Sequence, residues 1–188
     1  AVNKTLQTDG VVAITIGPME AGPRALGYHS ILALPSIQRN QINALKQREE
    51  WQPFGCVMRT KDTKRFFGQE FHSPYMNKVV RWKAPDYFAA RYPSLVHTDG
   101  TARVQTVDEP SGSQLLESME RFDAYVKEHG DATDFEDDLF NAPHAQVFAL
   151  ARPFSLAWPG PSYLWYVLGL MEQRGILPVL VNTSLNAK

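Results

Sequence analysis

The chain has 188 residues with a formal net charge of −1, and 44% of its residues are hydrophobic while 21% are charged. This composition predicts one globular domain with its own core and excludes a globally basic surface for nucleic acid or membrane, so a bound anion must be held by a local cluster of positive charge. Its one cysteine, Cys56, excludes an internal disulfide, and without a signal peptide or an apolar run of the ~20 residues that span a bilayer, the expected location is cytoplasmic.

The N-terminal half predicts short strands, a glycine-rich loop and one helix. An apolar, β-branched run at 11–16 is typical of a buried strand, and the loop after it ends at Gly27. Ser36 is expected to cap a helix in which apolar residues recur at helical spacing. In chain order, the predictions are the end of a helix over 1–8, strands over 11–16 and 30–34, a helix over 36–48, and strands over 55–60 and 75–82.

The C-terminal half continues the alternation of strands and helices. Both predicted helices are followed by a glycine that can end them, and the last strand runs into three polar residues. The predictions are a strand over 101–107, helices over 113–129 and 162–174, and a strand over 177–181 that leads into Asn182-Thr183-Ser184. This alternation favours an α/β fold in which helices cover a sheet.

Four separate segments carry side chains suited to an anionic ligand. Arg24 lies in the loop 22–27, where backbone N–H groups and a guanidinium can approach a phosphate, and Lys46 and Arg48 end the predicted helix. The other two segments are His97-Thr98-Asp99-Gly100-Thr101-Ala102-Arg103 and Asn182-Thr183-Ser184. Such residues also form turns, cap helices or complement a helix dipole. The residues alone therefore leave binding and structural roles open.

Other candidate sites are weaker. We interpret the acidic run 134–138 as a solvated face rather than a metal site, and the aromatic residues Tyr163, Trp165 and Tyr166 as packing. Cys56 has no evident thiolate partner, so a buried structural thiol is expected. The sequence contains no zinc pattern, Walker loop or Ser-His-Asp signature, and no metal site is predicted from its residues.

In this order, the four segments resemble the C-terminal domain of the antibiotic- and nodulation-type O-carbamoyltransferases. The matching motifs are ME-AGPRALG-HSILA, N-LK-RE-W-PF, H-DGTAR-QTV and PVLVNTSLN. The resemblance implies an α/β fold of the YrdC-like type, with a twisted mixed sheet, flanking helices and a positively lined cleft. It implies a single domain over 1–188 with an insert near 109–161 that is atypical of the family. The resemblance also implies that the family's N-terminal actin-like ATPase-type domain is absent from this chain, and from the start at Ala1 we expect a piece of a longer protein.

The resemblance also implies a reaction and its partners. Members of this family make carbamoyl-adenylate from carbamoyl phosphate and ATP, with Mg²⁺, through a carbamate that attacks the α-phosphate and expels pyrophosphate. The N-terminal domain then passes the carbamoyl group to an acceptor with a free hydroxyl. The acceptor class is left open among a sugar, an antibiotic, a nodulation oligosaccharide and a nucleobase, and nucleic acid is otherwise not expected as a partner.

Site residues follow from the resemblance as well. It gives catalytic roles to Lys46, Arg24 and Arg103. The residues implied to bind substrate or nucleotide are Arg24, Lys46, Arg48, Gln52, His97, Asp99, Arg103, Asn182 and Ser184. Gln52 is a departure, because the family usually has an arginine at this position, and glutamine donates hydrogen bonds but brings no charge.

Two alternatives from other functional classes stay open. One is a non-catalytic nucleotide- or nucleic-acid-binding module with a YrdC-like fold, in which Gln52 marks lost catalysis. The other is a structural partner domain in which 109–161 forms an interface, since Phe148, Phe154 and Trp158 are of the kind enriched at interfaces.

Overall fold

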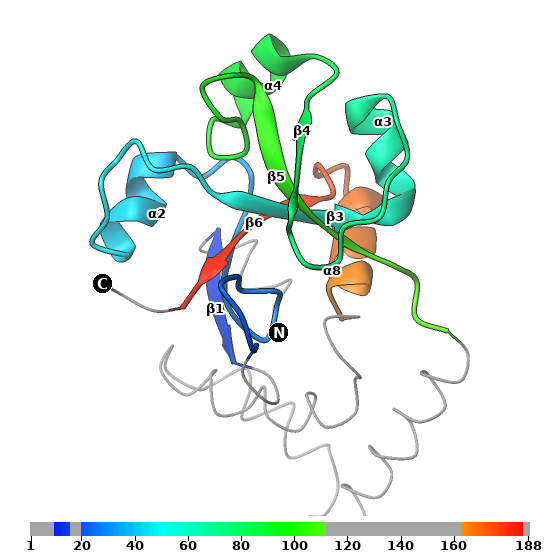
Figure 1. The fold of residues 1–188 in the computed structure, drawn as a ribbon, viewed down its shortest axis with the longest axis horizontal. Coiled ribbons are helices and arrows are strands. Elements are labelled where there is room, and N and C mark those ends of the chain that lie inside the picture. Colours follow the sequence, from blue (N-terminus) through cyan, green and yellow to red (C-terminus); the bar gives the residue numbers. More distant parts are fainter. Residues whose placement is uncertain (1–9, 16–19, 112–162, 186–188) are drawn as a thin grey trace, which may run out of the picture.

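The computed structural model describes residues 10–15, 20–111 and 163–185 (Figure 1). The predicted helices over 1–8 and 113–129, the acidic run 134–138 and the three interface aromatics lie outside these residues. Within the described ranges, no helix is both long and apolar enough to cross a membrane.

A six-stranded mixed sheet organises the described residues, and its strand order is β1-β2-β6-β3-β5-β4. The strands are β1 (Val11–Thr15), β2 (His29–Ala33), β3 (Gly55–Arg59), β4 (Lys78–Arg81), β5 (Thr101–Val107) and β6 (Val179–Ser184). Only β3 and β5 pair in parallel, and the other four pairs are antiparallel. The predicted mixed sheet with flanking helices is therefore confirmed, and the strand over 101–107 agrees with the prediction at both ends.

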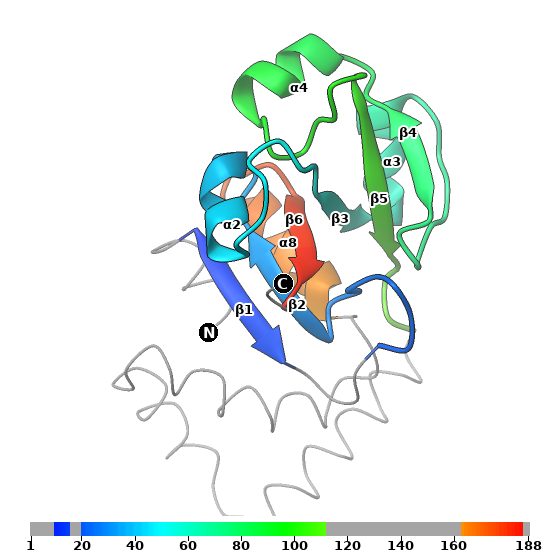
Figure 2. The same ribbon diagram turned by 60° about the vertical axis from the view of Figure 1, so that its left-hand side comes forward.

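Helices cover both faces of this sheet. They are α2 (Arg39–Leu45), α3 (Thr63–Phe67), α4 (Pro85–Arg91) and α8 (Tyr163–Gln173), with a 3₁₀ turn η1 (Thr60–Asp62). One buried cluster joins Cys56, Met58 and Val181 of the sheet to Ile42 of α2 and to aromatic residues of α3 and α4. The second cluster joins the alternate strand residues, such as Val57 and Leu180, to α8. Figure 2 shows α2 and α8 on opposite sides of β2 and β6.

The prediction for the first helix was wrong at both ends. Ser36 is not its cap, because the chain turns at this point, with the Ile37 N–H donating to the Leu34 carbonyl at 3.1 Å. Gln38 precedes the first helical residue, and its N–H donates to Gln41 Oε1 at 3.1 Å. The helix ends at Leu45 rather than 48, because Gln47 adopts the left-handed conformation with φ of 52°.

A network of ion pairs around the buried Arg59 connects α8 to β3. The Arg59 side chain is 3% exposed. Its Nε lies 2.7 Å from Asp62 Oδ2, and its Nη2 lies 2.5 Å from Glu172 Oε2 on α8. Arg65, which is exposed, adds a looser contact of 3.4 Å to the other oxygen of Glu172. At the first residue of α8, the Tyr163 hydroxyl donates to the Gly27 carbonyl at 2.9 Å, so α8 also holds the end of the glycine-rich loop.

Candidate functional site

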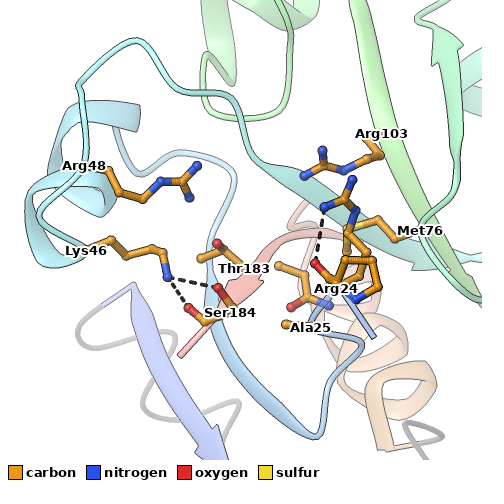
Figure 3. A pocket seen from close by; sticks show the side chains of 10 residues that line it. Arg24, Ala25, Lys46, Arg48, Met76, Arg103, Thr183 and Ser184 are labelled. Carbon is orange, nitrogen blue, oxygen red and sulfur yellow. Dashed lines mark hydrogen bonds between the residues drawn. The ribbon is translucent and has the colours of Figure 1, made fainter. Parts of the chain in front are cut away.

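A cavity of about 270 Å³ opens where β6 ends and β3 and β5 begin. The residues that line it come from five separate stretches of the chain: Pro23, Arg24, Ala25, Lys46, Arg48, Met76, Arg103, Asn182, Thr183 and Ser184. Figure 3 shows Lys46 and Arg48 on one side, Arg24 and Arg103 on the other, and Thr183 and Ser184 between them. The structure thus brings together six of the nine site residues that the sequence suggested.

Strand register explains why residues of three strands meet here. Gly55 on β3 pairs with Arg103 on β5 and with Asn182 on β6. A Cβ at Gly55 would lie 2.3 Å from Met76 Sδ, so only glycine lets the methionine pack at this point. Met76 itself has φ of 53°, an uncommon conformation for a residue other than glycine. The rule that ligands bind beyond the carboxyl ends of parallel strands does not apply, because β6 runs antiparallel to both neighbours.

The end of α2 positions two of the cations. The side chain of buried Asn43 donates from Nδ2 to the backbone carbonyls of Glu50 and Gln52, both at 3.0 Å. The backbone carbonyl of Asn43 accepts from the Arg48 N–H at 2.9 Å. The left-handed turn at Gln47 then separates Lys46 from Arg48. This local closure presents both side chains to the cavity, so Asn43 is a supporting residue that the sequence analysis did not identify.

Lys46 reaches from α2 to the end of β6. Its Nζ donates to the Ser184 carbonyl and, at 3.2 Å, to Ser184 Oγ (Figure 3). The side chain is only 3% exposed. Burial, followed by the nearby charge of Arg48, lowers the pKa of Lys46 below its usual value of 10.5. A buried ammonium beside another cation is unfavourable by itself, which favours the binding of an anion.

Arg103 is in a similar position on the opposite wall. Burial, and then the charge of Arg24, lowers the pKa of its guanidinium below its usual value, with a smaller contribution from Arg48. Arg103 Nε is buried and has no hydrogen-bond partner within the described ranges. Repulsion among cations and an unpaired donor are both relieved by a ligand that brings negative charge and acceptor oxygens.

The loop that carries Arg24 folds around a carboxylate. Glu20 Oε1 accepts from the N–H groups of Leu26, Tyr28 and His29, at 2.9, 2.8 and 3.1 Å. Burial is the largest single influence and raises the pKa of Glu20, but the backbone hydrogen bonds together lower it below its usual value of 4.5. The carboxylate is therefore part of the scaffold of the loop rather than a ligand group, and Glu20 was not among the predicted site residues.

Substituting Glu20→Gln is expected to destabilise the protein by about 1–3 kcal/mol, because hydrogen bonds to a charged acceptor are stronger than those to a neutral one. Since the folded-state pKa is lowered, the stabilisation is fully present above pH 4.5 and is lost as the pH falls through the lowered value. Urea unfolding of wild type and variant between pH 3 and 7 measures both effects. The two curves should converge at the acid end, and a constant gap across the range would contradict this role.

A buried pair of amides ties the same loop to the sheet. Asn182 Nδ2 donates to Gln105 Oε1 at 2.7 Å, and Gln105 Nε2 donates to the Leu26 carbonyl at 2.8 Å. Both amide side chains are only 1% exposed. Gln105 therefore connects β6 with the loop, which is a second supporting role that the sequence did not reveal.

Three predicted site residues do not line the cavity. The His97 ring lies 3.3 Å from the Phe54 carbonyl, and burial, with a smaller contribution from Arg103, lowers its pKa below 6.5, so it is neutral near pH 7. Asp99 is exposed and accepts from Thr101 Oγ1 at 2.6 Å, as expected for a turn. Gln52 Oε1 accepts from Arg48 Nε, so its amide orients the arginine and does not itself line the cavity.

Magnesium, which the resemblance implies, finds no ligand set in these residues. Mg²⁺ binds in proteins through one or two carboxylates together with phosphate oxygens and water. None of the described residues that line the cavity carries a carboxylate, and no group of three or more His, Cys, Asp or Glu suited to a metal occurs in the described ranges. The residues present therefore do not fit a metal ion held by the protein at this cavity.

What this arrangement can do is bind and polarise a compound with several negative charges. Arginines can bind phosphate in a bidentate manner, and lysine supplies a point charge. Among the described residues, the lining of the cavity offers no thiol, because Cys56 is buried outside it and burial raises its pKa to about 12. Positioning and electrostatic stabilisation are the catalytic means that these groups offer.

The sequence of the chain is also similar to those of known proteins. A family model described as "Carbamoyltransferase C-terminus" matches residues 3–129. The chain is 37% identical over 116 residues to a 3′-hydroxymethylcephem-O-carbamoyltransferase of Amycolatopsis lactamdurans, covering 61% of this chain and 22% of that protein. For the protein of the same name from Streptomyces clavuligerus, the identity is 36% over 117 residues, with the same coverage of 61% and 22%.

A nodulation protein, NolNO of Sinorhizobium fredii (strain NBRC 101917 / NGR234), is 38% identical over 122 residues, covering 60% of this chain and 17% of the relative. The chain thus spans about a fifth of the length of these relatives.

Proposed function

The chain belongs to the carbamoyltransferase C-terminal family, and from this premise we propose that it activates carbamoyl phosphate with ATP to give carbamoyl-adenylate. The observation that carries the proposal is the convergence of Arg24, Lys46, Arg48 and Arg103 on one cavity whose described lining has no carboxylate. The two substrates are both phosphate compounds with several negative charges, which such a cluster can neutralise.

The proposed chemistry needs no protein nucleophile. Water first releases inorganic phosphate from carbamoyl phosphate and leaves carbamate. A carbamate oxygen then attacks the α-phosphorus of ATP, a bond to that phosphorus forms, and the bond to the bridging oxygen breaks so that pyrophosphate leaves. Lys46 and Arg103 are proposed to offset the charge on the phosphates in both steps, and Arg24 to bind them from the loop. These are tasks of positioning and charge stabilisation.

The proposal is tested by following pyrophosphate release with ATP and carbamoyl phosphate present together. We expect release that needs both compounds, with little when either one is omitted, because the attacking carbamate comes from one and the leaving group from the other. Calorimetry with each compound separately measures the binding step. Absence of binding to both ATP and carbamoyl phosphate would contradict the proposal.

A second candidate function is a nucleotide- or nucleic-acid-binding module without turnover. It is favoured by Gln52, which accepts a hydrogen bond from Arg48 and adds no charge to the cluster. Binding to RNA or single-stranded DNA that falls steeply with salt, and that carbamoyl phosphate does not affect, would support this module.

The activity of a longer protein forms part of the proposal. The names of the cephem relatives describe O-carbamoyl transfer onto a hydroxymethyl group. By analogy, we propose that the activated carbamoyl group passes to an acceptor hydroxyl with the help of an N-terminal actin-like domain. A reducing, cytoplasmic compartment is proposed as the site of action because the chain has a single, buried thiol.

A further inference from the structure

The orientation of the Asn182 side chain is fixed by a chain of hydrogen bonds. A backbone carbonyl can only accept, so the side-chain atom of Gln105 that lies 2.8 Å from the Leu26 carbonyl must be Nε2. Gln105 therefore turns Oε1 toward Asn182, and Asn182 must in turn present Nδ2, at 2.7 Å. Exchanging oxygen and nitrogen in either amide would place two acceptors or two donors against each other.

This orientation leaves Asn182 Oδ1 as a buried acceptor on a residue that lines the cavity. The oxygen has no hydrogen-bond partner within the described ranges. The other buried unpaired atom of the cavity lining, Arg103 Nε, belongs to the residue on the far side of Gly55, where Met76 packs. A buried acceptor without a donor is unfavourable, so this oxygen favours a ligand that brings an N–H group.

We propose that Gln105 is a positioning residue that makes Asn182 Oδ1 the acceptor for the carbamoyl N–H₂ of the substrate, and so selects a carbamoyl phosphate over other acyl phosphates. The inference rests on the proposed function. In carbamoyl phosphate the N–H₂ group is separated from the phosphorus by one carbon and one oxygen, so a phosphate held by the cations of this cavity carries its N–H₂ close by. The amino group of ATP lies much farther from its phosphates.

Two hydrolytically stable phosphonates isolate this contact. Phosphonoacetamide and acetonylphosphonate share the phosphonate, the methylene and the carbonyl, and differ only in N–H₂ against CH₃. Calorimetry on the full 188-residue chain is expected to show phosphonoacetamide binding about tenfold more tightly or better, because the analogue without N–H leaves the buried oxygen unpaired.

Gln105→Met removes both hydrogen bonds at nearly constant side-chain volume. The variant should bind phosphonoacetamide more weakly, so that the ratio of the two affinities falls toward one. Its affinity for acetonylphosphonate should stay within about threefold of wild type. Asn182→Leu removes the acceptor itself and should give the same result, which decides the matter if Gln105→Met does not fold. The matched control is Gln69→Met at an exposed position, and it should keep the full preference.

Each outcome has one meaning. If wild type binds both phosphonates equally, the inference is overturned and the proposed function stands. If wild type binds neither the phosphonates nor carbamoyl phosphate, the proposed function is overturned with it. If the variants lose both affinities in parallel and keep the ratio, Gln105 is merely structural, and the positioning role is wrong.

Discussion

Alanine in place of Lys46 is expected to lower ATP- and carbamoyl phosphate-dependent pyrophosphate release by about 10²–10³-fold, the loss seen when one donor is removed from a preorganised anion site. Lys46 is 3% exposed and donates hydrogen bonds to the backbone carbonyl and the hydroxyl of Ser184, so its ammonium is fixed before any substrate binds. A fixed charge in a site of low dielectric stabilises a developing negative charge far more than a mobile surface charge does.

The matched control for this variant is Lys64→Ala, an exposed lysine on α3 outside the cavity, which should keep the wild-type rate. Lys46→Ala should still fold, because burial already disfavours the charged amine, as its lowered pKa indicates. Near-normal pyrophosphate release in a folded Lys46→Ala protein would be incompatible with the proposed role of this residue.

The pH profile offers a second measurement on the same residue. Because the pKa of Lys46 is lowered, its charge is lost earlier on the alkaline side than that of an ordinary lysine at 10.5. Phosphate binding should therefore weaken at a lower alkaline pH than it would with an ordinary lysine. A Lys46→Arg variant, whose guanidinium stays charged, should shift the alkaline loss of binding to higher pH.

The second large effect concerns stability. Arg59→Met is expected to lower the free energy of unfolding by about 3–5 kcal/mol, because it leaves the buried carboxylate of Asp62 without its cation. The variant also loses the contact to Glu172 that joins β3 to α8. Urea denaturation at neutral pH measures the difference in unfolding free energy.

A matched control exists at Glu172, which contacts both Arg59 and Arg65. Arg65→Met removes the exposed contact to Glu172 and should change the unfolding free energy by less than about 1 kcal/mol. Acid titration distinguishes the Arg59→Met and Arg65→Met variants further. Hydrogen bonding to Arg59 lowers the pKa of Glu172, so the contribution of this carboxylate is present above pH 4.5 and is lost as the pH falls through the lowered value. Equal losses in both variants would show that burial of Arg59 is not the cause.

The sequence predicted local features well. The strand Thr101–Val107 was predicted at both ends, because apolar and polar residues alternate along it and a turn at Gly100 precedes it. The cations Arg24, Lys46 and Arg103 were also predicted from motif resemblance, and all three line the cavity. These features depend on neighbours in the chain or on recognisable residue types.

What the sequence did not predict depends on contacts between distant segments or on the detailed path of a loop or turn. The insertion of β6 between β2 and β3 is set by packing of both sheet faces, and no residue of β6 encodes its neighbours. The role of Gln105 depends on a hydrogen bond to Leu26, which lies 79 residues earlier in the chain. The role of Glu20 depends on hydrogen bonds from residues six to nine positions later in the same loop. His97 and Asp99 share a motif with Arg103, yet strand and turn geometry direct them elsewhere.

The cations of the cavity come from stretches of the chain that lie far apart, and the charges of Arg24 and Arg48 both act on Arg103. In the unfolded chain these charges are distant and hydrated, whereas folding forces them together. Folding and anion capture are thereby coupled thermodynamically: every phosphate that enters relieves repulsion that exists only in the compact state. A compound that brings phosphate groups into this cavity would therefore also stabilise the folded protein.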